Sequence, residues 1–306
     1  MSKRQAWLHA FRLRTLPLAL SSILAGSSIA YADNKTGFSW LVFVLCILTT
    51  LFLQILSNLA NDYGDSEKGT DNEERIGPKR AVQLGLLSFN EIKTGIAICS
   101  GLALLSGVAL IYKGTQDLDI NYAIFFFLLG LGAIGAAVKY TMGKSAYGYM
   151  GLGDLFVFLF FGLVGVCGSH YLLAHKLHYS VLLPAFTIGA FSVGVLNLNN
   201  MRDHISDEKA GKITLVVRMG LGRAKRYHNL LIMLGFAASI VFVITNFTST
   251  MQFLFIITVP LFRRHLVAVK RVHHHVEFDP LLKQLAISTF IFSVLFAIGM
   301  VVGSIG

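Results

Sequence analysis

Nine long apolar runs, separated by short polar connections, constrain this chain more than any other feature of its sequence. Each run is long enough to cross the hydrocarbon core of a bilayer as a helix, which satisfies every backbone polar group within one segment. We therefore predict an all-α polytopic membrane protein, with about nine transmembrane helices in one bundle, two Asp-rich cytoplasmic loops and a single domain over residues 1–306. The runs lie near residues 15–31, 38–59, 92–112, 121–140, 150–174, 179–200, 227–246, 250–269 and 284–305.

The composition excludes the main classes of soluble protein. Apolar residues make up 55% of the chain and charged residues only 14%, whereas soluble domains are about 25% charged. Such a chain cannot cover a water-soluble surface, which excludes soluble enzymes, secreted disulfide scaffolds and soluble nucleic-acid binders. The three cysteines, Cys46, Cys99 and Cys167, have no paired spacing and predict neither a disulfide framework nor a zinc site.

The positions of the basic residues predict the topology. If the N-terminus is cytoplasmic, only Lys35, Lys113 and Lys176 of the 26 lysines and arginines fall outside. Lysine and arginine gather in cytoplasmic loops of membrane proteins, so we expect the C-terminus on the opposite side, in a bacterial plasma or inner membrane. Topology alone explains the net charge of +10, and no nucleic-acid partner is expected.

Two acidic clusters follow the second and sixth apolar runs. Both runs point toward the cytoplasm in this topology, so both clusters should emerge on one face of the membrane. Residues four apart lie on one face of a helix, which makes each cluster a short ladder of amides and carboxylates. The first contains Asn58, Asn61, Asp62 and Asp65, with Asp71 beyond it, and the second contains Asn199, Asp203 and Asp207.

This pattern predicts a divalent-cation site. Carboxylates that converge from two helices suit Mg²⁺, which takes one or two carboxylates and fills its other positions with water and phosphate oxygens. We expect Asp62, Asp65, Asp203 and Asp207 to be the metal-binding and catalytic residues. The alternative is that they are solvated loop carboxylates and helix caps.

A basic cluster comes after each acidic one and points to a diphosphate ligand. Arg75, Lys79 and Arg80 follow the first cluster, and Lys212 and Arg218 follow the second. Cations beside metal carboxylates suit a polyanion, although cytoplasmic topology also explains them. A polyprenyl tail would gain roughly 0.8 kcal/mol per buried CH₂ in the apolar interior. Neutralising the diphosphate would make it a leaving group, and a dry cavity would protect the resulting allylic cation from water.

The motifs resemble those of the UbiA superfamily of intramembrane prenyltransferases. The family pattern is N-D-x-x-D-x-x-x-D after the second helix and D-x-x-x-D after the sixth, which here read NDYGD at 61–65 and DHISD at 203–207. Gly69 stands where the last aspartate of the first motif would fall, and Asp71 is a candidate replacement. The resemblance implies that the four aspartates bind a Mg²⁺-diphosphate, with Asn61 and Asn199 assisting.

Within the superfamily, four segments are similar to the branch that prenylates 1,4-dihydroxy-2-naphthoate. They are RTLP at 14–17, NLANDYGDSEKGTD at 58–71, GYMGLGDLFVFLFFG at 148–162 and NNMRDHISDEKAGKITLVVRMG at 199–220. The resemblance implies Mg²⁺-dependent transfer of a polyprenyl group with loss of CO₂ and diphosphate, forming demethylmenaquinone. Its partners would be polyprenyl diphosphate, the aromatic acceptor and membrane lipid.

The acceptor site and two competing functions stay open at this point. Arg14 and Tyr140 are candidates to hold the acceptor carboxylate, although Arg14 also suits an interfacial anchor. Asp154 could contact the acceptor or cap a helix start. Another aromatic acceptor, such as 4-hydroxybenzoate, would fit the same superfamily. A secondary cation transporter is the alternative from a different class, but transporters place ion sites near the bilayer midplane.

Overall fold

The structure is a computed structural model that describes residues 2–70, 76–143 and 145–305. Within these ranges the regular structure is helical, with no β-strand. The α-helices are α1 (Lys3–Phe11), α2 (Leu16–Asp33), α3 (Trp40–Glu67), α4 (Phe89–Thr115), α5 (Ile120–Lys139), α6 (Gly153–Val157), α7 (Gly168–Ala174), α8 (Leu182–Lys209), α9 (Leu215–Met219), α10 (Leu221–Thr245), α11 (Val259–Arg271) and α12 (Phe278–Gly303). Short 3₁₀ segments and one π-helix join them: η1 (Leu13–Thr15), η2 (Tyr147–Met150), η3 (Phe158–Cys167), η4 (Tyr179–Val181), η5 (Thr250–Thr258) and η6 (His275–Glu277).

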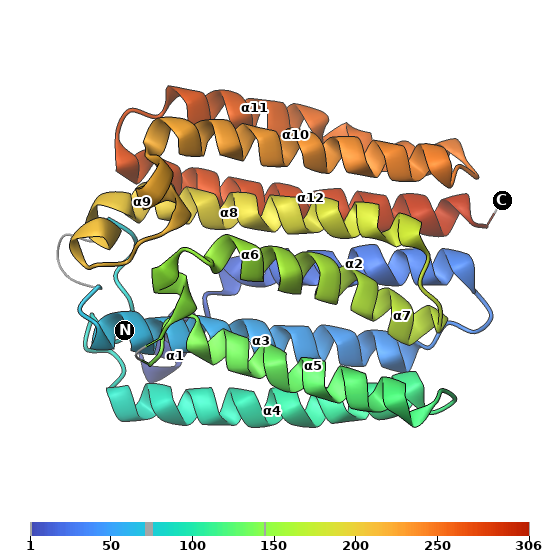
Figure 1. The fold of residues 1–306 in the computed structure, drawn as a ribbon, viewed down its shortest axis with the longest axis horizontal. Coiled ribbons are helices and arrows are strands. Elements are labelled where there is room, and N and C mark those ends of the chain that lie inside the picture. The colour runs from blue at the N-terminus through green and yellow to red at the C-terminus, as the bar shows by residue number, and fades with distance from the viewer. Residues whose placement is uncertain (1, 71–75, 144, 306) are drawn as a thin grey trace.

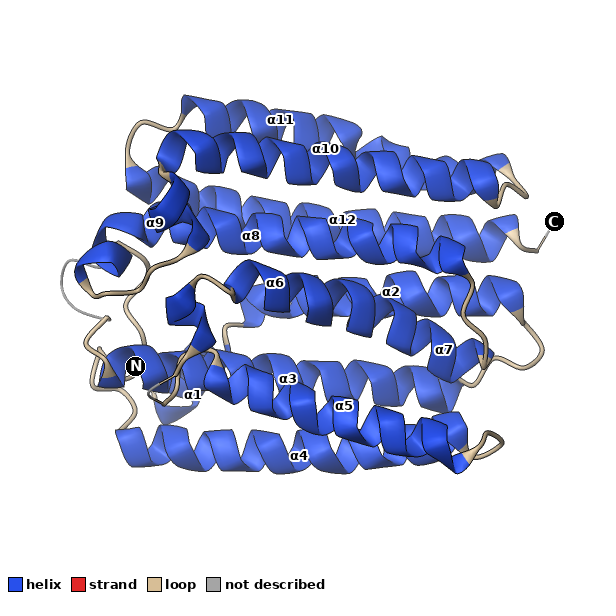
Figure 2. Ribbon diagram, viewed as in Figure 1, coloured by secondary structure: helices blue, strands red, loops and turns tan. Residues whose placement is uncertain are grey.

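The predicted membrane bundle is confirmed. In the described part of the chain, nine helical segments are long and apolar enough to cross a membrane, and they coincide with the nine apolar runs. The helix axes follow the long dimension of the molecule, and the two termini lie toward opposite ends of it (Figure 1). The connecting loops gather at these two ends (Figure 2). An odd number of spans produces this arrangement.

α2 and α8 form the centre of the bundle. Small residues let the neighbouring segments approach these helices closely. A Cβ atom on Gly26 of α2 would lie 2.2 Å from the carbonyl oxygen of Val166 in η3. A Cβ atom on Gly162 of η3 would lie 2.7 Å from the carbonyl oxygen of Ala185 in α8. These contacts fix α2, η3 and α8 against one another, and this core holds the polar end of α8 in place.

The fifth span is irregular. α6 continues into the π-helix η3, which continues into α7. π-helical segments are rare and occur frequently at functional sites. The wider helix lines the internal cavity described below with Phe160, Phe161 and Val164. Sequence patterns gave no signal for this change of helix type, because all the residues involved are apolar or glycine.

The second and sixth spans extend further than their apolar patterns predict. α3 continues to Glu67 and α8 to Lys209. The aspartates of both motifs therefore lie on the last turns of these two helices, and the prediction of two Asp-rich loops is wrong in this respect. The four motif aspartates on these turns are packed inside the protein, so tertiary contacts sustain helix where hydropathy ends.

Candidate active site

The four motif aspartates are buried. Asp62 is 1% exposed, Asp65 2%, Asp203 4% and Asp207 2%. The alternative of solvated loop carboxylates is therefore wrong. A carboxylate removed from water is costly unless cations and hydrogen bonds compensate it, and such partners surround all four.

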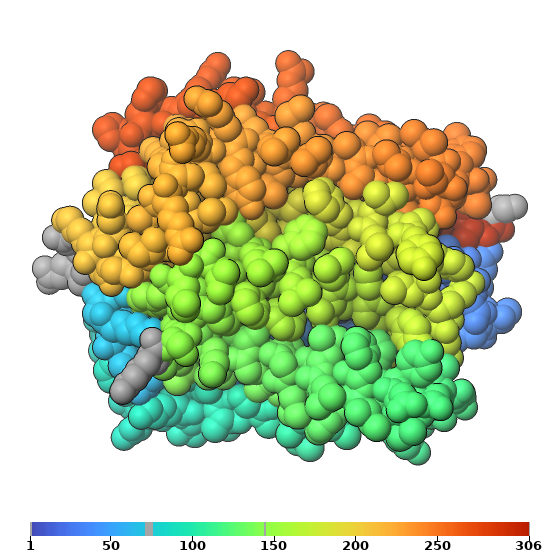
Figure 3. Space-filling view, in the orientation of Figure 1, coloured from blue at the N-terminus to red at the C-terminus, as the bar shows by residue number. Residues whose placement is uncertain are grey.

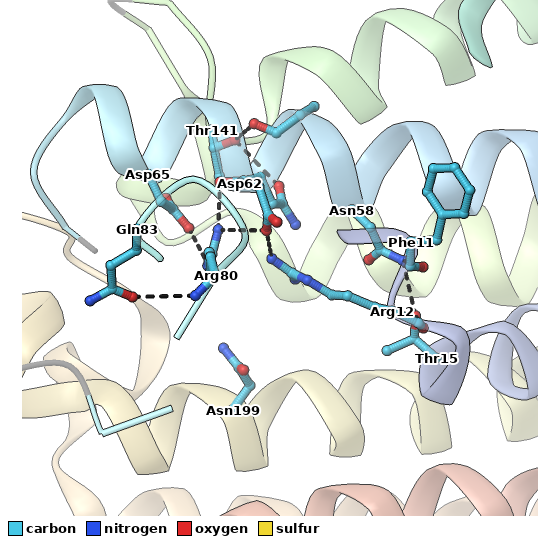
Figure 4. Close-up of polar contacts among 12 residues, drawn as sticks. Phe11, Arg12, Thr15, Asn58, Asp62, Asp65, Arg80, Gln83, Thr141 and Asn199 are labelled. Atoms are coloured by element: carbon cyan, nitrogen blue, oxygen red, sulfur yellow. Dashed lines mark hydrogen bonds and ion pairs between the residues drawn. The ribbon is translucent and has the colours of Figure 1, made fainter. Parts of the chain in front are cut away.

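Two arginines compensate the aspartates at the end of α3 (Figure 4). Arg12, between α1 and η1, forms an ion pair with Asp62. Arg80 lies 3.5 Å from Asp62 through Nη1 and 2.7 Å from Asp65 through Nη2. The same Nη1 donates to the carbonyl oxygen of Asn61 at 2.5 Å. Arg80 therefore bridges both aspartates of the first motif.

Asn58 holds the corner of the chain that carries Arg12. Its Nδ2 donates to the carbonyl oxygen of Phe11 at 3.0 Å and to Oγ1 of Thr15 at 3.1 Å. Arg12 has a φ of 50°, in the left-handed region that residues other than glycine rarely adopt. The hydrogen bonds of Asn58 stabilise this strained corner and so aim Arg12 at Asp62.

A second ion-pair network occupies the end of α8. Arg202 is buried and contacts Asp203 twice, at 2.7 Å through Nη2 and at 2.9 Å through Nε. Its Nη2 also donates to Oδ1 of Asn199 at 2.9 Å, and its Nη1 lies 2.5 Å from Oδ1 of Asp279 in α12. The other oxygen of Asp279 lies 3.7 Å from Nη1 of Arg14. Asp279 thus connects Arg14 to the second motif.

Lys212 joins the two acidic helix ends. Its Nζ lies 3.5 Å from Oδ1 of Asp207. Burial lowers the pKa of Lys212, but the nearby carboxylates of Asp65 and Asp207 outweigh burial and raise this pKa above its ordinary value. Tyr149, in η2, donates to Asp65 at 2.8 Å, and Lys212 lies over its ring. The ends of α3 and α8 therefore share one buried cation.

A cavity of about 380 Å³ leads from this polar cluster into the apolar core. Among the predicted residues that line its polar end are Arg14, Asn58, Asn61, Asp65, Arg80, Tyr140, Asn199 and Lys212. Its apolar lining includes Ile23, Cys46, Leu110, Phe126 and Leu172. Loss of hydration raises the pKa of Tyr140 to about 12, which keeps its phenol neutral. The cavity has the shape and polarity to take an amphiphile with an anionic head and a long apolar tail.

The carboxylate and amide oxygens at this site are ligands of the type that Mg²⁺ prefers. Oδ2 of Asp207 is buried and has no hydrogen-bond partner in the described chain, and the neighbouring carboxylate and amide oxygens are hard ligands. Over residues 2–70, 76–143 and 145–305, no three His, Cys, Asp or Glu side chains are gathered for direct metal binding. Arg12, Arg80, Arg202 and Lys212 stand beside the carboxylates instead. A cation here would therefore take part of its ligand shell from water and phosphate oxygens.

Several predicted site residues do not line the cavity, among them Asp62, Asp203 and Asp207 of the two motifs. Lys79 is exposed, and Arg218 is exposed and donates to the carbonyl oxygen of Met150 at 2.8 Å. Asp154 is buried in the first turn of α6, near the side chain of Tyr227. Asp71 and Arg75 lie outside the described residues. The binding roles of these residues stay predictions.

Sequence reasoning missed Arg12, Arg202, Tyr149 and Asp279 at this site. Arg202 directly precedes the second motif, and Tyr149 lies in the GYMGLGDLFVFLFFG segment at 148–162. Their positions next to these motifs could have marked them as candidates. Arg12 could be suspected from its proximity to Arg14. Asp279 is far from both motifs, and only the packing of α12 places it here.

The fold defines an integral membrane protein, and its site combines a buried ion-pair cluster with an apolar cavity. The profile of the UbiA prenyltransferase family matches residues 19–277. The chain belongs to this family and is a prenyltransferase.

Two relatives match almost the whole chain. The 1,4-dihydroxy-2-naphthoate octaprenyltransferase of Haemophilus influenzae is 42% identical, over 98% of this chain and 97% of that protein. The protein of the same name from Escherichia coli is 41% identical, over 98% and 96%. Among solved structures, a UbiA homologue from Archaeoglobus fulgidus bound to GPP and Mg²⁺ has a TM-score of 0.65 at 16% identity, covering 97% of this chain and 99% of that one. This likeness confirms the fold.

Proposed function

We propose that this enzyme transfers a polyprenyl group from polyprenyl diphosphate to 1,4-dihydroxy-2-naphthoate, releasing diphosphate and CO₂ and forming demethylmenaquinol, the reduced form of demethylmenaquinone. The observation that carries the proposal is the buried ion-pair cluster at the mouth of an apolar cavity. The names of the two full-length relatives support the choice of acceptor. The polar end of the bundle and the N-terminus would face the cytoplasm, in keeping with the distribution of lysine and arginine.

The polar cluster would bind the diphosphate head. Arg80 and Lys212 both line the cavity and carry positive charge, so they can donate charge-assisted hydrogen bonds to phosphate oxygens. Bound Mg²⁺ would neutralise further charge on the diphosphate. The motif aspartates, with Asn61 and Asn199 assisting, would supply part of its ligand shell, and water and phosphate oxygens would supply the rest. The prenyl tail would then extend along the apolar wall toward Leu110 and Leu172.

The transfer step needs no added oxidant or reductant. The C1–O bond of the prenyl diphosphate breaks and both electrons leave with diphosphate. The ring carbon that bears the carboxylate then supplies an electron pair to C1, forming a C–C bond. Loss of CO₂ from that carbon returns an electron pair to the ring, so no proton need be removed there. The apolar lining excludes the water that would otherwise capture the allylic cation.

Arg14 and Tyr140 would orient the acceptor. Both line the cavity beside the polar cluster. The guanidinium of Arg14 can pair with the acceptor carboxylate, and Tyr140, whose pKa is raised to about 12 by burial, can donate a hydrogen bond as a neutral phenol. Asp279 lies 3.7 Å from Arg14 and would limit how tightly Arg14 holds the carboxylate before its loss.

An acceptor panel tests the proposed function. Purified protein in detergent receives one labelled polyprenyl diphosphate with either 1,4-dihydroxy-2-naphthoate or 4-hydroxybenzoate, in Mg²⁺ or in excess chelator. We expect prenylated product and released CO₂ only with the naphthoate, and a loss of activity on chelation that added Mg²⁺ restores. Transfer to the benzoate alone, or full activity in chelator, would contradict the proposal.

Asp279 should act as a positioning residue for the diphosphate half of the site. Asp279→Asn leaves Arg202 and Arg14 with less counter-charge, and we expect kcat/KM for prenyl diphosphate to fall roughly ten-fold, in line with the effect of losing outer partners at a metal site. The Mg²⁺ concentration for half-maximal activity should rise in parallel. Asp279→Glu, which keeps the charge, should recover part of the loss. An unchanged Mg²⁺ dependence in Asp279→Asn would show that Asp279 has only a structural role.

A further inference from the structure

α11 carries four exposed cations that no described residue neutralises. They are Arg263, Arg264, Lys270 and Arg271. None of them forms an ion pair with a described residue. The acidic groups that follow α11 are occupied, because Glu277 accepts from the backbone N–H of His273 at 3.1 Å and Asp279 binds Arg202 at 2.5 Å. We call these four cations the basic face of α11.

The helical period directs the basic face away from the protein. Phe262, His265 and Val269 form the buried side of α11. Positions seven residues apart lie almost above one another on a helix, so Arg263 aligns with Lys270 and Arg264 with Arg271, about 10 Å apart along the axis. Long side chains project from the edge of the molecule formed by α10 and α11 (Figure 3). The basic face therefore looks toward the surrounding membrane rather than into the bundle.

Contacts between α10 and α11 fix the depth of these cations. Nε2 of His228 in α10 lies 3.0 Å from Nε2 of His265, which places Arg263 and Arg264 at the level of His228. Closer to the polar end, Nζ of Lys225 donates to the carbonyl oxygen of Val272 at 2.8 Å. The two helices are thus antiparallel neighbours with a known register.

The surface of α10 changes from basic to apolar at this same level. Arg223 and Arg226 are exposed before His228, whereas the first exposed residues after it are Leu230, Met233 and Leu234. Arg263 and Arg264 consequently lie where the headgroup layer meets the hydrocarbon. Charged side chains in membrane spans usually face the bundle interior, because a lipid-facing charge is costly. These two face outward, so they need an anionic partner from the membrane.

We propose that the basic face of α11, together with Arg223 and Arg226 of α10, binds the phosphodiester headgroup of an anionic phospholipid. The guanidinium groups pair with phosphate oxygens. The acyl chains lie along the exposed apolar side chains below, among them Leu230 and Met233 of α10 and Leu261 of α11. This site is separate from the prenyl-transfer cavity and does not depend on the proposed function.

Lipid titration of the purified full-length protein tests the proposal. Native mass spectrometry measures binding of phosphatidylglycerol and of phosphatidylcholine to the protein released from detergent. Each cation near an anionic lipid contributes roughly 1 kcal/mol, or about five-fold in affinity. We therefore expect wild-type protein to prefer phosphatidylglycerol by at least about ten-fold, and Arg263→Gln with Arg264→Gln and Lys270→Gln to lose most of this preference.

A matched triple variant controls for lost charge. Arg4, Lys93 and Lys139 are exposed cations of the other half of the bundle, and their replacement by glutamine should leave the lipid preference unchanged. If the α11 triple variant does not fold, the pair Arg263→Gln with Arg264→Gln is measured in its place. Equal binding of the two lipids by wild type, or an undiminished preference in the folded α11 variant, overturns the proposal. An equal loss of preference in the control variant also overturns it, because net charge would then explain the effect.

Discussion

Asp203→Asn is expected to lower kcat/KM for prenyl transfer by roughly 10²- to 10³-fold, the range found when one preorganised charge-stabilising group is removed from an active site. Asp203 is buried beside Arg202, and Arg202 also holds Asn199 and Asp279. The asparagine keeps the shape of the side chain but removes its negative charge. The site then binds a divalent cation more weakly, and the positive charge of Arg202 is no longer fully compensated. Steady-state assays at several Mg²⁺ concentrations measure both effects.

Glu208→Gln is the matched control for this variant. Glu208 lies on the same helix but is exposed, whereas Asp203 is buried and paired with Arg202. We expect it to retain wild-type activity. Both variants are compared as folded protein, checked by the midpoint of thermal unfolding in detergent. Full activity in folded Asp203→Asn would count decisively against a catalytic role for the second motif.

Arg80→Gln should produce the second large effect, a fall in kcat/KM for prenyl diphosphate of about 10²-fold. Arg80 bridges Asp62 and Asp65 and lines the cavity. A charged hydrogen bond of this kind contributes up to about 3 kcal/mol, and its loss also leaves two buried carboxylates with less compensation. We expect most of this fall to appear as a higher KM for prenyl diphosphate, with little change in KM for the aromatic acceptor. Initial-rate kinetics with each substrate varied in turn separate the two.

Lys79→Gln is the informative comparison for Arg80→Gln. The sequence gives Lys79 and Arg80 the same expected role, but the structure buries Arg80 and exposes Lys79. Near wild-type kinetics in Lys79→Gln are therefore expected. A KM effect as large as that of Arg80→Gln would mean that the diphosphate binds outside the cavity, at the surface of the loop.

Hydropathy and short-range spacing were sufficient to predict the spans and the acidic helix ends. The nine apolar runs correspond to nine membrane-length helices of the described chain, because a lipid environment leaves few other ways to satisfy the backbone. The spacing of four residues also predicted that Asn58 and Asp62 share one face of a helix, and that Asp203 and Asp207 share one face of another. These are local properties that a helix carries wherever it packs.

Long-range partners were not predictable in the same way. Asp279 meets Arg202 across 77 positions of sequence, and Arg12 meets Asp62 across 50. Such contacts depend on how helices pack, and no local spacing records them. The roles proposed for Lys79 and Arg218 came from charge order along the chain, which also follows from cytoplasmic topology. Charge order alone therefore could not separate surface cations from Lys212 and Arg80.

A double-mutant cycle between Asp62 and Asp203 tests most directly whether the ends of α3 and α8 bind one diphosphate. The measurement is the Mg²⁺-dependent dissociation constant of a non-reactive prenyl thiolodiphosphate for wild type, Asp62→Asn, Asp203→Asn and the double variant. Groups that share one ligand show coupling energies of 0.5–3 kcal/mol, whereas independent sites give additive changes. We predict that the double variant binds only slightly more weakly than either single variant, with a coupling energy of about 1 kcal/mol or more. Strictly additive losses would contradict a shared diphosphate site.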